Sequence, residues 1–142
     1  MQVPPASDQA IKELLNEPVV AKVASTSRSG DIRITPIWFG DDNGTILMNT
    51  FEDSELVRNL KSNPRCSLIV DSSDFPYYGV HYWGSATVEG PENDVEGIAK
   101  LFAPYRGDVD TAREYAQTLI GWGTRVYVRF RPTRHKSWDF RG

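Results

Sequence analysis

The stretch FEDSELVRNLKSNPRCSLIVD, residues 51–71, predicts a short capped helix followed directly by a strand. Asp53 and Ser54 offer side-chain oxygens that accept hydrogen bonds from the first N–H groups of a helix. Apolar residues then recur at helical spacing, at Leu56, Val57 and Leu60. Asn63-Pro64 ends the helix before the apolar run 66–71. Basic residues crowd the same segment, at Arg58, Lys61 and Arg65, which raises the question of whether this helix faces an anion.

Strand-like segments lie on both sides of this helix. We expect strands over 19–26, 32–39, 45–50, 66–71, 80–90 and 125–132. Asn43-Gly44 favours a tight hairpin, and residues 80–90 alternate as a strand with one buried face does. Further helices are expected after Ser7 and over 91–120, the latter in two pieces broken around Pro104–Gly107. Six strands joined mostly by hairpin-length links predict a mainly β protein, a small antiparallel barrel with helices covering its ends.

The composition is that of an ordinary globular chain. Its 142 residues, 25% of them charged, suffice for one domain with a modest core, and we treat residues 1–142 as that domain. A formal net charge of -3 argues against a nucleic-acid partner, which needs a dominant basic surface. The single cysteine, Cys66, permits no intrachain disulfide, and the sequence shows no signal peptide or membrane-spanning apolar run. We therefore expect a cytoplasmic protein without a nucleic-acid or membrane partner.

Metal and nucleophile chemistries find no support in the motifs. The histidines are His81 and His135, and the sequence has no Cys-x-x-Cys, no His-Glu-x-x-His and no calcium-type acidic loop. It also lacks the Gly-x-Ser-x-Gly turn of serine hydrolases, a Walker loop and a Gly-x-Gly-x-x-Gly fingerprint after a strand. If the chain is an enzyme, we expect its reactive group to be a bound cofactor, with the protein supplying binding, orientation and electrostatics.

Four short motifs follow one another in a characteristic order. They are Thr-Pro-x-Trp at 35–38, Asn-Thr at 49–50, Ser-Glu-Leu-Val-Arg-Asn-Leu at 54–60 and Asn-Pro-Arg-Cys-Ser-Leu-Ile-Val at 63–70. No single motif is specific, but their succession resembles the pyridoxamine 5'-phosphate oxidase-like family. The similarity runs from about Leu14 to Gly90 and resumes at 125–132 and Trp138. It implies a six-stranded flavin-binding split β-barrel, similar to the short bacterial members that use FMN or the deazaflavin F420.

This resemblance implies a homodimer whose cofactor lies in a groove between the subunits. Contacts with the flavin ring are then expected from the second and third strands, at Thr35, Pro36, Ile37, Trp38, Asn49 and Thr50. Contacts with the cofactor phosphate are expected from Ser54 and Arg58, at and just after the start of the helix. The fifth strand and the C-terminal tail of the second subunit would contribute Trp83 and Trp138.

The helix departs from the family pattern at one position. Many relatives read Lys-x-x-Asn-Leu, with the lysine holding the cofactor phosphate, whereas this chain has Leu56 in the lysine's place. Losing a charge-assisted contact costs roughly 1.5–3 kcal/mol, which is about one to two decades of affinity. Backbone N–H groups at the helix start still offer an anion cradle, and the arginines available as substitutes are Arg33, Arg58 and Arg65. The sequence does not distinguish FMN from F420 as the cofactor, because both need a site for an anion and a site for a planar ring.

Each of these positions also has a purely structural interpretation. The helix could plug one end of a barrel, with Leu56 as a core residue. Trp38 and Trp83 could be core or dimer-interface aromatics. Arg129 and Arg131 alternate with apolar residues, which is typical of a solvated strand face. Structural roles are equally open to Asn59, Cys66 and His81.

The leading functional interpretation is an FMN- or F420-dependent oxidoreductase that transfers hydride to a small planar substrate, with no residue identified as a general acid. The alternative is a flavin- or haem-binding or sensing protein without turnover, in which a haem would need His81 or His135 as its ligand. A third interpretation is a ligand-free dimeric scaffold. Oxidation of pyridoxamine phosphate itself is not expected, because the short chain shows no match to the C-terminal substrate-binding segment of the true oxidases.

Overall fold

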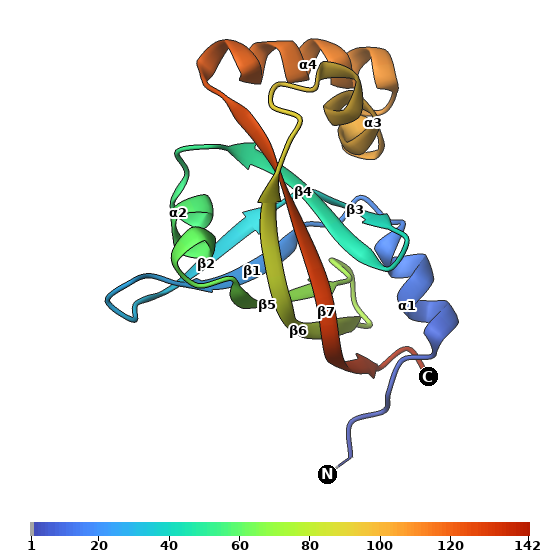
Figure 1. Cartoon of the computed structure of the whole chain (residues 1–142). Coiled ribbons are helices and arrows are strands. Elements are labelled where there is room, and N and C mark those ends of the chain that lie inside the picture. Colours follow the sequence, from blue (N-terminus) through green and yellow to red (C-terminus); the bar gives the residue numbers. More distant parts are fainter. Residues whose placement is uncertain (1) are drawn as a thin grey trace.

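A single curled antiparallel sheet organises the computed structural model, which describes residues 2–142. Its strands are β1 (Ala21–Thr26), β2 (Ile32–Ile37), β3 (Phe39–Asp42), β4 (Thr45–Phe51), β5 (Arg65–Asp71), β6 (Tyr78–Glu89) and β7 (Arg125–Asp139). They follow the order β2-β1-β5-β6-β7-β4-β3, and every neighbouring pair is antiparallel. The sheet curls into a half-barrel (Figure 1), which confirms the predicted mainly β class and its split-barrel form.

The helices are inserted between the strands at the places that the sequence predicts. They are α1 (Asp8–Leu15), α2 (Glu55–Ser62), α3 (Val95–Arg106) and α4 (Val109–Trp122). The Ser7 hydroxyl accepts a hydrogen bond from the Ala10 N–H at 3.0 Å and caps α1. The break between α3 and α4 falls at Gly107, whose φ of 99° lies in the left-handed region that favours glycine. No helix formed by residues 2–142 combines the length and the apolar character needed to cross a membrane.

The sheet has seven strands rather than the predicted six because the chain changes partners at Trp38. β2 pairs with β1, whereas β3 pairs with β4. The hairpin between β3 and β4 turns on Asn43 and Gly44 alone, with φ of 52° and 85°, so residues 40–42 belong to a strand. β7 also runs on to Asp139 instead of ending at 132, because its second half pairs with the first half of β6.

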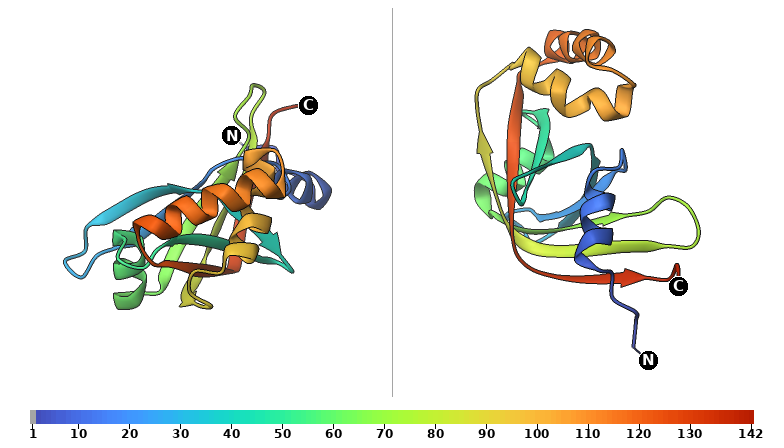
Figure 2. Two further views of the ribbon diagram at one scale, coloured as in Figure 1. Left: turned by 90° about the horizontal axis from the view of Figure 1, so that it is seen from above. Right: turned by 90° about the vertical axis from the view of Figure 1, so that its right-hand side faces the viewer.

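The two longest strands bend together at Gly84. The pairing of β6 with β7 shifts register between Trp83 and Gly84. A Cβ atom at Gly84 would lie 2.1 Å from the carbonyl oxygen of Arg131, so only glycine lets the two backbones approach this closely. The bend separates the half of β7 that borders α3 and α4 from the half that leads to the C-terminus (Figure 2).

Apolar side chains form two clusters, one on each face of β4 and β7. Met48 and Val128 belong to the cluster inside the half-barrel, which α1 and α2 complete. Leu47 and Tyr127, one residue along each strand, belong to a second cluster with α3 and α4. These two helices lie together across one end of the sheet (Figure 2). They bury a strand face that the sequence alone would leave in solvent.

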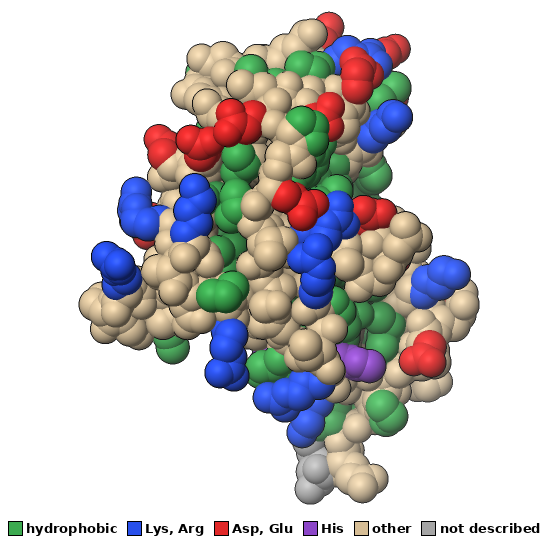
Figure 3. Space-filling model, in the orientation of Figure 1, with side chains coloured by type: hydrophobic (Ala, Val, Ile, Leu, Met, Phe, Trp, Pro, Cys, Tyr) green, Lys and Arg blue, Asp and Glu red, His purple; other side chains and the backbone are tan. Residues whose placement is uncertain are grey.

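The prediction of a solvated face at Arg129 was therefore wrong. The Arg129 side chain is 21% exposed and forms ion pairs with Asp42 and Glu89, each at 2.7 Å. Arg131 lies two residues further along β7, beyond the part that the helices cover, and is exposed as predicted. On the face shown in Figure 3, basic side chains are spread over the sheet and acidic ones gather toward the end that carries α3 and α4.

Candidate functional site

Helix α2 is held in place by its cap and by its apolar face. The Ser54 hydroxyl accepts a hydrogen bond from the Val57 N–H at 3.3 Å. Leu56 is 1% exposed and belongs to the core inside the half-barrel. Asn59 is also buried and donates to the Ser25 hydroxyl at 3.1 Å. Leu56 is thus a core residue in this chain, and Ser54 and Asn59 have structural partners of their own.

The basic side chains near α2 do not converge on its first turn. Arg33 forms an ion pair with Glu55 at 2.8 Å, which neutralises it and places a carboxylate at the helix start. Arg58 is exposed, with a long contact of 3.4 Å to the carbonyl oxygen of Asp53, and it lines a different hollow with Arg28 and Lys61. Arg65 lies on β5. Within one chain, therefore, Ser54 and Arg58 do not form a charged phosphate site.

A cavity of about 420 Å³ lies where the ends of β2 and β4 meet the start of β7 beneath α3 and α4. We call it the aromatic cavity, and its lining residues are Val20, Pro36, Ile37, Trp38, Asn49, Thr50, Phe51, Phe102, Tyr115, Leu119 and Arg125. Its volume falls in the range typical of small-molecule sites. Five of the ten predicted cofactor contacts line it together: Pro36, Ile37, Trp38, Asn49 and Thr50.

The position of Trp38 is fixed by α3. Its indole stacks on Tyr105 at 4.6 Å with planes 10° apart, and it meets Phe102 edge-on at 5.0 Å. The Tyr105 hydroxyl donates to the Val19 carbonyl at 2.8 Å and accepts from the Phe39 N–H at 3.1 Å. Burial raises the pKa of Tyr105, so its hydroxyl stays protonated at neutral pH. This packing gives the cavity a rigid aromatic wall at the point where β2 ends.

Asn49 and Arg125 form the polar part of the cavity. Arg125 Nε donates to Asn49 Oδ1 at 2.9 Å, and Arg125 Nη2 donates to the Asn49 carbonyl at 3.1 Å. The guanidinium lies 4.4 Å from the ring centre of Phe51. Burial lowers the pKa of Arg125, although an arginine remains charged at neutral pH. Asn49 Nδ2 is buried and has no hydrogen-bond partner among the described residues.

The sequence reasoning missed Arg125. The alternation along 125–132 places Arg125 on the same strand face as Tyr127 and Arg129. An arginine at the end of a strand is usually in contact with solvent. Here it is 6% exposed, because α3 and α4 cover that face. The available signal was the prediction of two helices directly before this strand.

Thr35, the remaining predicted ring contact, does not line the aromatic cavity. It pairs with Val23 on β1, and its buried hydroxyl has no partner among the described residues. The structure therefore places Thr35 next to, and not among, the residues that line the cavity.

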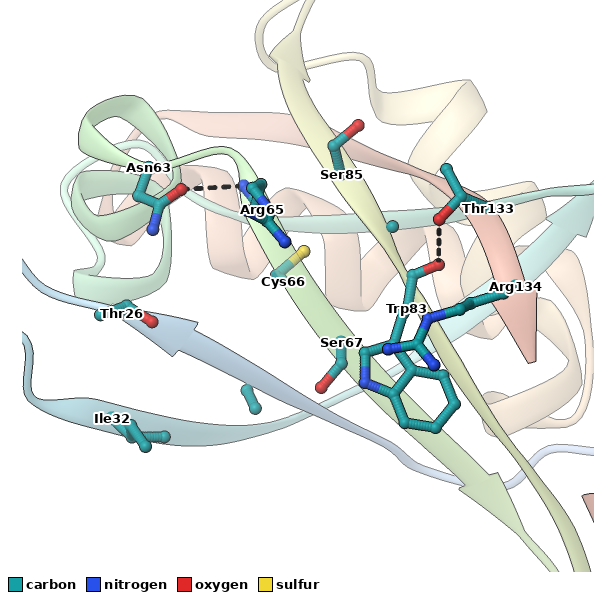
Figure 4. Close-up of a pocket in the computed structure, with 12 residues that line it drawn as sticks. Thr26, Ile32, Asn63, Arg65, Cys66, Ser67, Trp83, Ser85, Thr133 and Arg134 are labelled. Carbon is teal, nitrogen blue, oxygen red and sulfur yellow. Dashed lines mark hydrogen bonds between the residues drawn. The ribbon is translucent and has the colours of Figure 1, made fainter. Parts of the chain in front are cut away.

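The two predicted tryptophans of the second subunit lie away from the aromatic cavity of their own chain. Trp83 borders a separate groove of about 550 Å³ on β1, β5, β6 and β7 (Figure 4), which we call the Trp83 groove. There the Arg134 guanidinium lies 4.1 Å from its ring centre, and His81 packs on it at 3.7 Å. Trp138 packs over Gly79 near the end of β7, where a Cβ atom would come within 2.6 Å of the indole.

The Trp83 groove also contains the thiol of Cys66 (Figure 4). Burial raises the pKa of Cys66 to about 11, which keeps it a neutral thiol. Burial, together with the nearby charge of Arg134, lowers the pKa of His81. Neither group lines the aromatic cavity, which is the site with the larger share of predicted residues.

Comparisons with known proteins agree with this fold. The sequence profile described as pyridoxamine 5'-phosphate oxidase matches residues 7–139. No curated protein matches the chain. Among solved structures, it is similar to a conserved hypothetical protein from Mycobacterium tuberculosis, with 23% identity, 99% of this chain and 89% of that chain covered, and a TM-score of 0.81. It is also similar to an F420 reductase, with 22% identity, 91% of this chain and 98% of that chain covered, and a TM-score of 0.71. The similarity to HutZ, the haem storage protein from Vibrio cholerae, has 16% identity, covers 89% of this chain and 90% of that chain, and has a TM-score of 0.68.

The curled sheet, with the aromatic cavity at the end covered by α3 and α4, defines a split-barrel protein. Because the profile spans nearly the whole chain, the protein belongs to the pyridoxamine 5'-phosphate oxidase family. The solved structures, at identities below a quarter, show that the fold is shared.

The residues of the aromatic cavity suit the ring of a flavin or deazaflavin better than those of α2 suit its phosphate. The cavity offers aromatic walls and the buried Arg125 guanidinium, which match a planar ring with polar edges. The first turn of α2 offers backbone N–H groups, a paired Arg33 and the carboxylate of Glu55.

Proposed function

We propose that this protein is a flavin- or deazaflavin-dependent oxidoreductase whose cofactor ring binds in the aromatic cavity. The observation that supports this most directly is the buried Arg125 guanidinium, held by Asn49 and without an ion-pair partner among residues 2–142, in a cavity lined mostly by apolar and aromatic groups. Buried donors without acceptors are costly, so such an arrangement favours a ligand that supplies the acceptors. When bound, the ring would supply hydride transfer to a small planar substrate.

The chain's own residues would then bind and orient that ring. Trp38 and Phe51 provide apolar surface, and Asn49 and Thr50 provide hydrogen-bonding groups at the end of β4. Helices α3 and α4 cover this end of the sheet and contribute Phe102, Tyr115 and Leu119 to the lining of the cavity. A low local dielectric strengthens each polar contact made inside the cavity.

We propose a homodimer as the functional unit. Ile32 and Ile34 are 74% and 67% exposed on β2, an edge strand of the sheet, and a second copy would cover this apolar surface. A second copy is also the means by which Trp83 and Trp138 could reach a cofactor that starts in the aromatic cavity of its neighbour. Light scattering on the purified protein tests this: a dimer mass supports the proposal, and a monomer at tens of micromolar contradicts it.

The phosphate end of the cofactor is where FMN and F420 could be discriminated. Since Leu56 is in the core and Arg33 is paired, we propose that the phosphate binds to α2 backbone N–H groups, with added contacts from the second subunit. Riboflavin, which lacks the phosphate, should then bind only modestly more weakly than FMN. If riboflavin bound more weakly than FMN by more than about two decades of affinity, the protein would have a strong phosphate site, which would contradict this proposal.

The test of the oxidoreductase proposal starts from the visible spectrum of freshly purified protein. Fluorescence titrations with FMN and F420 follow, on the wild type and on Asn49→Ala and Thr50→Ala. We expect saturable binding of one cofactor that both substitutions weaken. The matched controls Asn16→Ala and Thr118→Ala remove the same side chains from exposed positions, just after α1 and within α4, and should leave binding unchanged. A colourless protein that binds neither cofactor would contradict the proposal.

A second candidate is a protein that binds its cofactor without turnover. The burial of Leu56, which leaves no charged anchor for the phosphate on α2, favours weak or exchangeable binding. Photoreduced cofactor separates the two: reoxidation by added quinones that the protein accelerates supports an enzyme, and an unchanged rate supports a binding role. A haem site would show a Soret band that is lost in His81→Ala or His135→Ala.

A further inference from the structure

We propose that Arg125, oriented by Asn49, makes the aromatic cavity select the reduced, negatively charged form of its ring. This inference rests on the proposed function, since it concerns the same cavity and the same ring. It adds a role that membership of the family does not assign, a charge-recognition residue at the start of β7.

The first observation is that Arg125 is a buried cation without a counter-ion. Its side chain is 6% exposed. Among residues 2–142 it forms no ion pair, although seven other ion pairs are present. A buried charge that lacks an opposite charge is unfavourable, and a bound anion removes that cost.

The second observation is the direction of the remaining donors. Nε and Nη2 of Arg125 are occupied by Asn49, whereas Nη1 makes no hydrogen bond to a described residue. Phe51 covers the guanidinium at 4.4 Å. Asn49 Oδ1 accepts from Arg125 Nε and so fixes the orientation of the guanidinium. One charged donor, Nη1 of Arg125, therefore remains for an acceptor in the cavity.

The third point is the chemistry of the ring. Reduction of a flavin by two electrons and one proton converts a neutral ring into one that carries a single negative charge. A fixed guanidinium stabilises that charge more than it stabilises the neutral oxidised flavin ring. Among residues 2–142 no carboxylate forms an ion pair with Arg125. The cation therefore has no local competitor for the ring.

The test compares the dissociation constants of the oxidised and the reduced cofactor, measured anaerobically. For the wild type we expect the reduced form to bind roughly tenfold more tightly, which raises the two-electron midpoint potential by about 30 mV over the free cofactor. Arg125→Gln should remove this preference, and Arg125→Lys should retain part of it. Arg106→Gln is the matched control, because Arg106 lies over Tyr115 at 4.9 Å but is exposed and does not line the cavity.

The outcomes separate the two proposals. A wild type that binds both redox forms equally, or an Arg125→Gln variant that weakens both equally, overturns the role of Arg125 and leaves the proposed function standing. A wild type that binds neither form overturns the proposed function and this inference with it. The wild-type ratio needs no variant, so the test holds even where Arg125→Gln fails to fold.

Discussion

Arg125 and Asn49 are joined by two hydrogen bonds across the pair β4 and β7, Nε to Oδ1 at 2.9 Å and Nη2 to the main-chain oxygen at 3.1 Å. The strand register brings them close, because Arg125 pairs with Phe51, two residues along from Asn49. Their burial depends on α3 and α4, which lie over this end of the sheet. A polar pair fixed by the sheet and covered by helices is the feature that connects the fold to the proposed site.

Asn49→Ala should lower the free energy of unfolding by about 1.5–3 kcal/mol, the usual effect of losing a hydrogen bond to a charged group. The reason is that the buried Arg125 Nε would lose its side-chain acceptor. Urea denaturation of the variant and of Asn16→Ala measures the difference. Equal stability of the two variants would mean that the Arg125 side chain finds another acceptor.

Asn49→Asp should leave the stability of the fold nearly unchanged but should remove the preference of the cavity for the reduced ring. A carboxylate at this position gives Arg125 the counter-ion that it lacks, so the pair becomes neutral. We expect the preference for the reduced ring to disappear while the unfolding free energy stays near that of the wild type. Retained preference with a normal fold would contradict the assignment of Arg125 as the charge-recognition group.

Leu56→Ala should destabilise the protein by about 2–5 kcal/mol, as expected for a large apolar side chain removed from a packed core. Leu56 is 1% exposed, whereas Leu15, at the end of α1, is half-buried. Thermal unfolding of Leu56→Ala and Leu15→Ala compares the two positions. A smaller loss for Leu56→Ala than for Leu15→Ala would show that the side chain lies outside the core.

Gly84→Ala should cost about 3 kcal/mol, because the new methyl group would meet the backbone of Arg131. Gly121→Ala offers the opposite case: its Cβ atom meets nothing within 4 Å, and alanine favours the helix by up to about 1 kcal/mol. Chemical denaturation of both variants measures this contrast. A stable Gly84→Ala protein would mean that β6 and β7 do not approach at this point.

The thiol of Cys66 should react slowly with a disulfide reagent. Its pKa is raised by burial from 9.0 to about 11, so at mildly alkaline pH the reactive thiolate is roughly a hundredfold rarer than in an exposed cysteine. The rate should keep rising with pH until the pH approaches 11. The same protein in denaturant is the control, and equal rates in the folded and unfolded states would contradict the burial of this thiol.

Much of the fold follows from local sequence signals. The Ser54 cap, the apolar spacing in α2 and the Asn43-Gly44 turn each act over a few residues, so the sequence predicted them correctly. The count of six strands failed because a change of partner at Trp38 depends on which strands lie beside it. Tertiary pairing of this kind leaves no periodicity in the sequence.

The candidate site was predictable only in part for the same reason. Residues near the ends of β2 and β4 gather in one cavity because β3 and β4 form a short hairpin, whose turn is visible in the sequence. Arg125 joins them from a distant segment, through the pairing of β4 with β7. Its burial needs the further fact that α3 and α4 cover that face. Neither relationship can be read from spacing along the chain.

The most direct measurement of the central claim is a crystal structure of the protein with bound FMN or F420, whichever titration shows to bind. We expect the ring in the aromatic cavity, in contact with Trp38 and within hydrogen-bond distance of the Arg125 guanidinium. A ring bound instead in the Trp83 groove of the same chain, with the aromatic cavity filled by water, would contradict it.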